Sequence, residues 1–288
     1  MYTPLIPLEL NPRRFRVLVP LSRATACIEA AIAKWQEEFG RVWDRLPLRI
    51  GVVAFPRLTS FQAVIEAARN LEAFLDEPYE QETWRVAEVK TRDGVTVLRL
   101  KRPDGGQEVA QVPIRLPDGR EDVFYPYVQV EDRALRFPRD FQHPDGRLYR
   151  HVGDLRPGDG ISVWPSRIAA VFLDTTAHRF EKPRVWSLAE FTLMREVWEL
   201  VRRTAPSITA LRRAWSELVE RRSQWQGPDG NWLEGAEEQW LALVRSVLVD
   251  QWGASGAALD TLVEAARDGI LEWAVEWHLT WLKEKLEG

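Results

Sequence analysis

Residues 48–55, Leu-Arg-Ile-Gly-Val-Val-Ala-Phe, are almost wholly apolar, which predicts a strand that is buried on both faces. Ser60 follows as a helix cap, and apolar residues then recur at helical spacing. A similar pair comes earlier, because residues 15–19 form a short strand-like run and Ser22 is placed to cap another helix. Residues 13–76 therefore predict a β-α-β-α series, half or more of a ferredoxin-like or palm-type unit.

The middle of the chain, residues 79–184, changes to short alternating strands. Each Pro-Asp-Gly combines a preset backbone angle with a residue that tolerates positive φ, as tight turns require. The pattern predicts a β-rich, antiparallel module, with strands near 95–98, 109–114, 123–130 and 161–163 and Pro-Asp-Gly turns at 103–105, 117–119 and 144–146.

The last part, residues 185–288, is predicted to be a helical bundle. Ser187 and Glu190 form a capping box that opens its first helix. We expect helices near 187–204, 206–225, 234–252 and 255–286, with a break near Gly269. The fold class is therefore α+β, with a partial ferredoxin-like or palm βαβα unit, a β-rich middle module and a C-terminal helical bundle. The predicted domains are 1–78, a degenerate palm-like α/β domain, then 79–184 and 185–288.

The composition narrows the function classes. Cys27 is the one cysteine among 288 residues, so the sequence excludes internal disulfides and multi-cysteine zinc sites, and its helical spacing makes it a core residue. No run approaches the length of a membrane helix, and the first residues lack the basic region of a signal peptide. We therefore expect a cytoplasmic protein with no membrane partner.

Tryptophan and charge are both unevenly distributed. Ten of the fourteen tryptophans fall after residue 185, and the net charges of the three segments are +1, +1 and −6. Since no segment carries a strong basic field, any binding of nucleic acid must be local.

Motifs for catalysis are missing from the sequence. It contains no GxxxxGK[ST], GxGxxG or GxSxG pattern, and its four histidines stand singly. Asp174 could be a functional acid, although an aspartate followed by threonine is more often a cap. We therefore predict no catalytic, cofactor-binding or metal-binding residues in this chain, and no cofactor.

Three arginine doublets are the candidates for RNA binding. Guanidinium groups bind phosphates with paired hydrogen bonds, and neighbouring tryptophans could stack on bases. In a continuous helix the first two doublets would share a face, which Pro206 makes less favourable. The alternative, favoured on general grounds, is a solvated face paired with Glu199, Glu217 and Glu220. The doublets are Arg202 and Arg203, Arg212 and Arg213, and Arg221 and Arg222.

Trp273, Trp277 and Trp281 lie four residues apart and form one stripe of a helix. Such a stripe is more often core or subunit contact than a base-stacking surface. We name these three tryptophans as candidates for docking a partner.

Several stretches of the sequence resemble a known family. Residues 11–20 (Asn-Pro-Arg-Arg-Phe-Arg-Val-Leu-Val-Pro), the helix after them, residues 45–56 and residues 63–69 are similar to the second half of a palm domain. The match is to the large subunit of type III CRISPR effector complexes, in its divergent branch. Trp164-Pro165-Ser166 and residues 172–181 also resemble that branch.

The resemblance implies a specific loss of function. In the family a Gly-Gly-Asp-Asp turn precedes the strand equivalent to residues 15–19, and its aspartates hold the metal ions used to join ATP into cyclic oligoadenylate. This chain has Asn11-Pro12-Arg13-Arg14 there, which removes metal-holding oxygens and adds cations. The family's nuclease His-Asp pair, first palm and zinc site are also absent, so the resemblance implies a large-subunit half without its own active site.

Three functions follow as expectations. The leading one is a non-catalytic subunit, or separately encoded C-terminal half, of a type III CRISPR antiviral ribonucleoprotein. Its partners would be guide RNA, target RNA and other effector subunits, including an N-terminal half of the large subunit. The first alternative is a palm-domain half of a cyclic-oligoadenylate synthetase whose active site a partner chain completes. The second is a protein-interaction scaffold with no RNA contact, which the acidic last third favours mildly.

Overall fold

The computed structural model describes residues 5–11, 14–76, 81–132, 134–173, 183–226 and 232–283. The chain divides into two compact units, one of residues 1–24 with 190–288 and one of residues 25–189. The fold is mixed α+β, with a large antiparallel sheet and C-terminal helices, as the sequence predicted. The finer assignment to a ferredoxin-like or palm unit and the three-domain division stay predictions.

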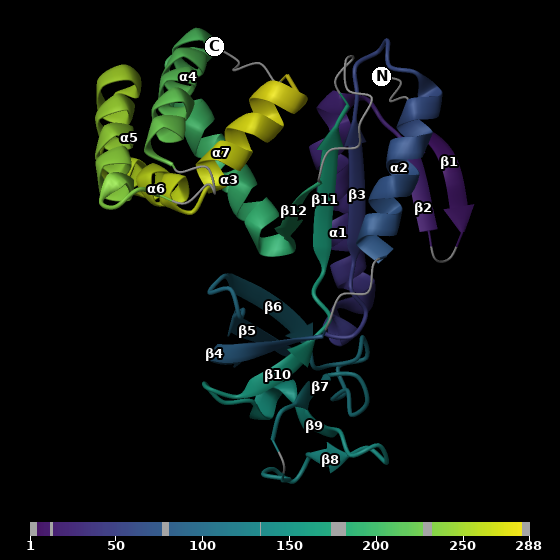
Figure 1. Cartoon of the computed structure of the whole chain (residues 1–288). Coiled ribbons are helices and arrows are strands. Elements are labelled where there is room, and N and C mark those ends of the chain that lie inside the picture. The colour runs from purple at the N-terminus through teal and green to yellow at the C-terminus, as the bar shows by residue number, and fades with distance from the viewer. Residues whose placement is uncertain are drawn as a thin grey trace. The chain divides into compact units, whose positions relative to one another are not determined.

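The unit of residues 25–189 is organised by a parallel strand pair. β3 (Arg49–Ala54) pairs with β11 (Arg167–Phe172) over its whole length, and β12 (Arg184–Ser187) adds an antiparallel third strand. The helix α2 (Phe61–Asp76) packs on both parallel strands (Figure 1). Gly51 permits this close packing, because a Cβ there would lie 3.2 Å from Leu71 Cδ2.

Two local expectations in this region were wrong. β3 is only partly buried, with Ala54 its one buried residue, because it lies at the end of the sheet order β12-β11-β3. Ser22 does not cap the first helix, since it lies inside a 3₁₀ turn (η1, Leu21–Arg23) and α1 (Ala24–Phe39) begins after that turn. Ser60 does directly precede α2, and its carbonyl accepts the amide of Val64 at 3.1 Å. Cys27 is half-buried.

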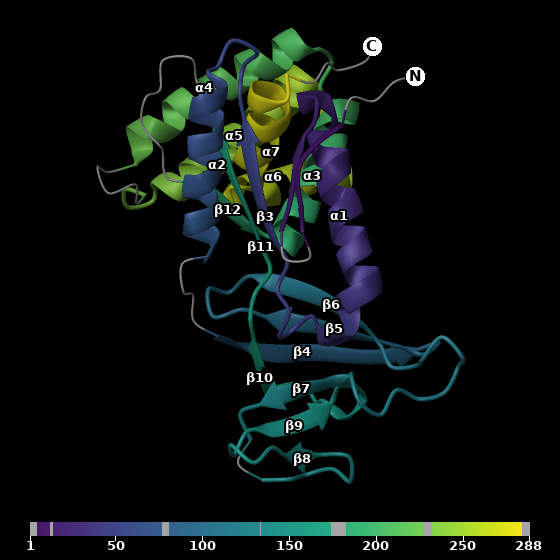
Figure 2. The same cartoon turned by 90° about the vertical axis from the view of Figure 1, so that its right-hand side faces the viewer.

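A seven-stranded antiparallel sheet lies in the chain between α2 and β11. Its strands are in the order β6-β5-β4-β10-β7-β9-β8, and Figure 2 shows them one after another. The β-rich module is therefore an insertion into the connection between two parallel strands. The strands are β4 (Glu82–Arg92), β5 (Val95–Lys101), β6 (Gln107–Pro113), β7 (Tyr127–Val130), β8 (Phe141–Gln142), β9 (Leu148–His151) and β10 (Gly160–Val163).

The predicted turns are confirmed. The glycines of the three Pro-Asp-Gly turns, Gly105, Gly119 and Gly146, have φ of +90°, +86° and +90°, which other residues rarely adopt. The strand expected over 123–130 begins only at Tyr127. Asp122 accepts the amides of Phe124 and Tyr125, each at 3.0 Å, and this turns the preceding backbone out of the sheet.

One face of this sheet forms the core of the module. Trp43, which follows α1 in the chain, packs on Trp84 of β4 with ring centroids 6.1 Å apart. The buried residues alternate along each strand, as a half-buried antiparallel sheet requires. They are Trp84, Val86, Leu98, Leu100, Val112, Val128, Val130, Leu148, Ile161 and Val163, joined by Trp43, Val152 and Leu155.

The other unit contains a hairpin and the C-terminal helices. β1 (Ile6–Asn11) and β2 (Arg14–Leu18) are antiparallel, with Asn11 opposite Arg14. The predicted helices are confirmed, including the break at Gly269, whose φ is +76°. They are α3 (Leu188–Thr204), α4 (Ile208–Trp225), α5 (Ala236–Trp252), α6 (Gly256–Arg267) and α7 (Ile270–Val275), which continues as a π-helical segment, η4 (Glu276–Trp281).

Within the described part of the chain, no helix has the length and apolar character needed to cross a membrane.

Asp44 makes the stability of the unit of residues 25–189 depend on pH. Burial raises the pKa of its carboxyl from 3.8 to about 6, against the opposing effect of Arg45. A raised carboxyl pKa means that the folded protein favours protonated Asp44 over ionised Asp44. The stability that the protonated carboxyl provides is therefore lost as the pH rises through about 6.

We therefore expect the free energy of unfolding of Asp44→Asn, measured relative to that of the natural protein, to increase by about 2 kcal/mol when the pH is raised from about 4.5 to about 7.5. Urea unfolding followed by circular dichroism at the two pH values measures this. A stability difference that stays constant between them would contradict the burial effect.

Candidate nucleic-acid interface

The arginine doublets predicted to bind RNA lie on α3 and α4, and both members of the α3 doublet are already engaged. Arg202 Nη1 lies 3.4 Å from Glu199 Oε1, and Arg203 Nε donates to the Glu199 carbonyl at 3.2 Å. The continuous helix that would align Arg202 with Arg213 does not form. Ser207 Oγ accepts the amide of Ala210 at 3.1 Å and starts a separate helix.

Arg222 has a structural position in the bundle. Its guanidinium forms an ion pair with Glu272 of α7 and lies over the rings of Trp232 and Trp240, 5.5 Å and 5.4 Å from their centroids. These contacts join α4 to α5 and α7 and occupy the group that would bind phosphate.

Arg212, Arg213 and Arg221 are the members of the set that are exposed and open to an anion. Within the described ranges their side chains form no hydrogen bond or ion pair, so the expected pairing with Glu217 and Glu220 does not involve them. They are spread around α4, because positions one, eight and nine residues apart on a helix differ in direction by about 80° to 180°. This arrangement offers separate contacts and no single phosphate-binding cradle.

The tryptophan stripe has the character of a core. Trp277 and Trp281 are 1% and 6% exposed, and Trp273 is half-buried. The ring of Trp277 packs edge-on against Phe191 at 5.6 Å and lies 5.5 Å from Trp281. A buried ring cannot reach a partner while the bundle stays closed, so this burial favours a core role for Trp277 and Trp281 over partner docking.

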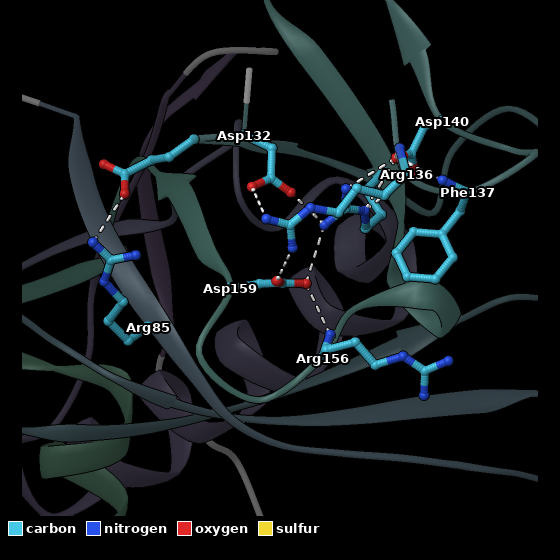
Figure 3. A network of polar contacts seen from close by, with 9 residues as sticks. Arg85, Asp132, Arg136, Phe137, Asp140, Arg156 and Asp159 are labelled. Carbon is cyan, nitrogen blue, oxygen red and sulfur yellow. Dashed lines mark hydrogen bonds and ion pairs between the residues drawn. The ribbon is translucent and has the colours of Figure 1, made fainter. Parts of the chain in front are cut away.

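A buried network of charges, which the sequence did not indicate, lies in the inserted module (Figure 3). Arg150 of β9 is fully buried and contacts three carboxylates. Its Nη1 lies 2.8 Å from Asp132 and 3.2 Å from Asp159, and its Nη2 lies 2.9 Å from Asp140. Phe137 covers the guanidinium, with its ring centroid 4.8 Å away.

The network is saturated by its own members. Asp140 also accepts the amides of Arg136 and Phe137, at 2.8 Å and 3.2 Å. Burial acts to raise the pKa of the Asp140 carboxyl, but the hydrogen bonds from Arg150 and these amides hold it below its ordinary value. All three carboxylates are therefore already paired with the guanidinium of Arg150. The arrangement can hold the loop after β7 against β9, but it has no free group for catalysis.

No group of acidic, histidine and cysteine side chains that could hold a metal ion occurs among the residues described by the structure. Asp174, and most of the family-like stretch 172–181, lie outside the described residues, so their assignments stay predictions.

The comparisons with known proteins give no family. No protein-family model matches the chain, and neither a curated protein nor a solved structure matches it significantly.

Neighbouring arginines on α4 provide a test of these assignments. We expect Arg222→Ala to destabilise the bundle by about 2 kcal/mol, because it removes two ring contacts and leaves Glu272 without its cation. Arg221→Ala is the matched control and should change stability by less than about 0.5 kcal/mol. Hydrogen exchange of the α4 and α5 amides measures both, and equal effects would contradict the structural position of Arg222.

The buried network has a similar control on one hairpin. Arg150→Ala leaves three carboxylates facing one another without their cation. We therefore expect the stability of the inserted module to fall by about 3 to 5 kcal/mol. Arg147→Ala removes an exposed ion pair with Asp145 and should cost less than about 1 kcal/mol. Hydrogen exchange of the β7 and β9 amides reports the module alone. A small effect of Arg150→Ala would show that the network does not hold the sheet.

Proposed function

We propose that this chain is a non-catalytic subunit, or a separately encoded C-terminal half, of a type III CRISPR RNA-guided antiviral ribonucleoprotein of the cytoplasm. It contacts RNA and other effector subunits. The resemblance of residues 11–20, 45–56 and 63–69 to a palm domain of that family is the basis of the proposal.

The order of elements supports the proposal most directly. The hairpin β1–β2 pairs Asn11 with Arg14, so the segment that replaces the family's metal-binding turn joins two antiparallel strands. α1, β3, α2 and β11 follow in the chain, and β3 and β11 are parallel with α2 packed on them. Since Arg13 and Arg14 place cations where the family holds divalent metal ions, this hairpin is unsuited to metal catalysis.

The proposal predicts co-purification. A tagged copy expressed beside a CRISPR array should recover short RNA and other CRISPR-associated proteins at low salt. Proteomics and RNA sequencing of the eluate, with an absorbance ratio at 260 and 280 nm, measure this. The control is the same tag on an unrelated protein. Recovery of neither RNA nor those proteins would contradict the proposal.

The retained hairpin also supports a second candidate, in which a partner bearing Gly-Gly-Asp-Asp completes a cyclic-oligoadenylate synthetase. Adding that partner with ATP and Mg²⁺ separates the two functions, because only the second predicts cyclic oligoadenylate that requires both chains. The scaffold function without RNA predicts recovery of effector proteins from a nuclease-treated lysate and no bound RNA.

A further inference from the structure

The seven-stranded sheet of the inserted module has a second face, opposite its core. The register places Lys101 opposite Arg85, Arg99 opposite Glu88, Val97 opposite Lys90 and Val95 opposite Arg92. Residues opposite one another in an antiparallel pair share a face. Since Val86, Leu98 and Leu100 point into the core, the following five cations lie together on the other face: Arg85, Lys90, Arg92, Arg99 and Lys101.

These cations are well exposed and incompletely neutralised. The side chains of Arg85, Lys90, Arg92 and Arg99 are 59%, 72%, 90% and 63% exposed. Their partners are three carboxylates, Glu88, Glu131 and Asp93. Arg85, which is labelled in Figure 3, forms its ion pair with Glu131 at 3.1 Å.

The local charge is therefore positive on a chain whose net charge is −4. Ion pairs at this exposure contribute little, so their cations can exchange a carboxylate for a phosphate at small cost. Within the described chain Lys101 has no ion pair at all.

The same face continues across the sheet to two aromatic rings, the exposed Phe141 and the half-buried Tyr149. β10 places Gly160 opposite Arg85, and β9 places Tyr149 opposite Gln129 on one side and Phe141 on the other. The rings of Phe141 and Tyr149 are stacked, 5.2 Å apart with planes at 11°. Phe141 is 45% exposed, and Tyr127 supports it edge-on at 5.4 Å.

We propose that this face, defined by the five cations and the Phe141–Tyr149 pair, binds a single-stranded nucleic acid. The cations on β4 and β5 contact the phosphates, and the ring pair stacks on unpaired bases. Cations two residues apart on one strand are about 6.8 Å apart, which lets successive side chains reach separate phosphates along an extended chain.

Single strands fit this surface better than the other ligand classes do. A duplex hides the faces of its bases, so it could not use the aromatic pair. A protein interface has an apolar core poor in lysine, whereas here charged side chains occupy the middle of the face. RNA as the natural ligand rests on the proposed function, but the surface itself is argued from charge and ring placement alone.

The experiment measures the fluorescence anisotropy of a labelled single-stranded RNA of about twelve nucleotides, a length within the usual site size. The charge variant is Lys90→Glu with Arg99→Glu and Lys101→Glu. It should weaken binding at least about thirtyfold and reduce the salt slope by about 2, since single strands lose about 0.7 per phosphate contact. Phe141→Leu with Tyr149→Leu should weaken binding about tenfold with an unchanged salt slope.

The matched control reverses the three exposed arginines of α4, with Arg212→Glu, Arg213→Glu and Arg221→Glu. This control changes the net charge by the same amount as the charge variant does, but on α4. Its affinity for the single-stranded RNA should be nearly that of the natural protein. Circular dichroism and thermal melting check that each variant is folded, and all three sets of substitutions lie on exposed or half-buried positions.

Each outcome is decisive for the surface. Loss of binding in the α4 variant with full binding in the charge variant would overturn the inference and leave the proposed function intact. Failure of the natural chain to bind single-stranded RNA or DNA at low salt would also overturn the proposed surface. The proposed function would then still be tested separately by the co-purification of effector proteins. Binding of DNA alone would support the surface and contradict the RNA assignment. If the aromatic variant bound single-stranded RNA as tightly as the natural protein does, that result would overturn the stacking contact.

Discussion

The parallel pairing of β3 with β11 is the constraint on which the inserted module depends. It joins residues 49–54 to residues 167–172, so it closes a connection of more than a hundred residues. Closing so long a loop has an entropy cost that grows only slowly with length, and a folded insertion whose own ends lie close together reduces that cost further. The packing of α2 on both strands and the close approach at Gly51 stabilise the pair on one side.

Within the insertion, the two faces of one sheet carry different chemistry. The inner face has its apolar core and, toward β9, a fully buried guanidinium whose carboxylate partners replace water. The outer face has exposed cations at one end and a stacked aromatic pair at the other. Because side chains alternate along a strand, Tyr149 and Arg150 are neighbours in the chain but belong to opposite faces. The internal network therefore fixes the strand that presents the ring.

The bundle shows how a doublet of like residues can divide its roles. Arg221 points to solvent, whereas Arg222 is held between two tryptophan rings and Glu272. The high tryptophan content of this segment has a packing explanation, since rings such as Trp277 fill the space between helices. The acidic charge of the bundle and the cations of the inserted sheet make the sheet the better surface for a nucleic acid.

The sequence by itself determined the elements that depend on neighbours in the chain. The Pro-Asp-Gly turns, the helix stop at Gly269 and most helix bounds were predictable because backbone conformation and spacing of a few residues decide them. Only the tertiary structure decided which strands pair. β4, β11 and β12 were not anticipated, and neither were the partners of Arg150 and Arg222. The partners of Arg150 lie 9 to 18 positions away, Glu272 lies 50 positions from Arg222, and the paired residues of β3 and β11 are 118 positions apart. Whether an arginine is buried, paired or open to a phosphate depends on that pairing, and local sequence carries no record of it.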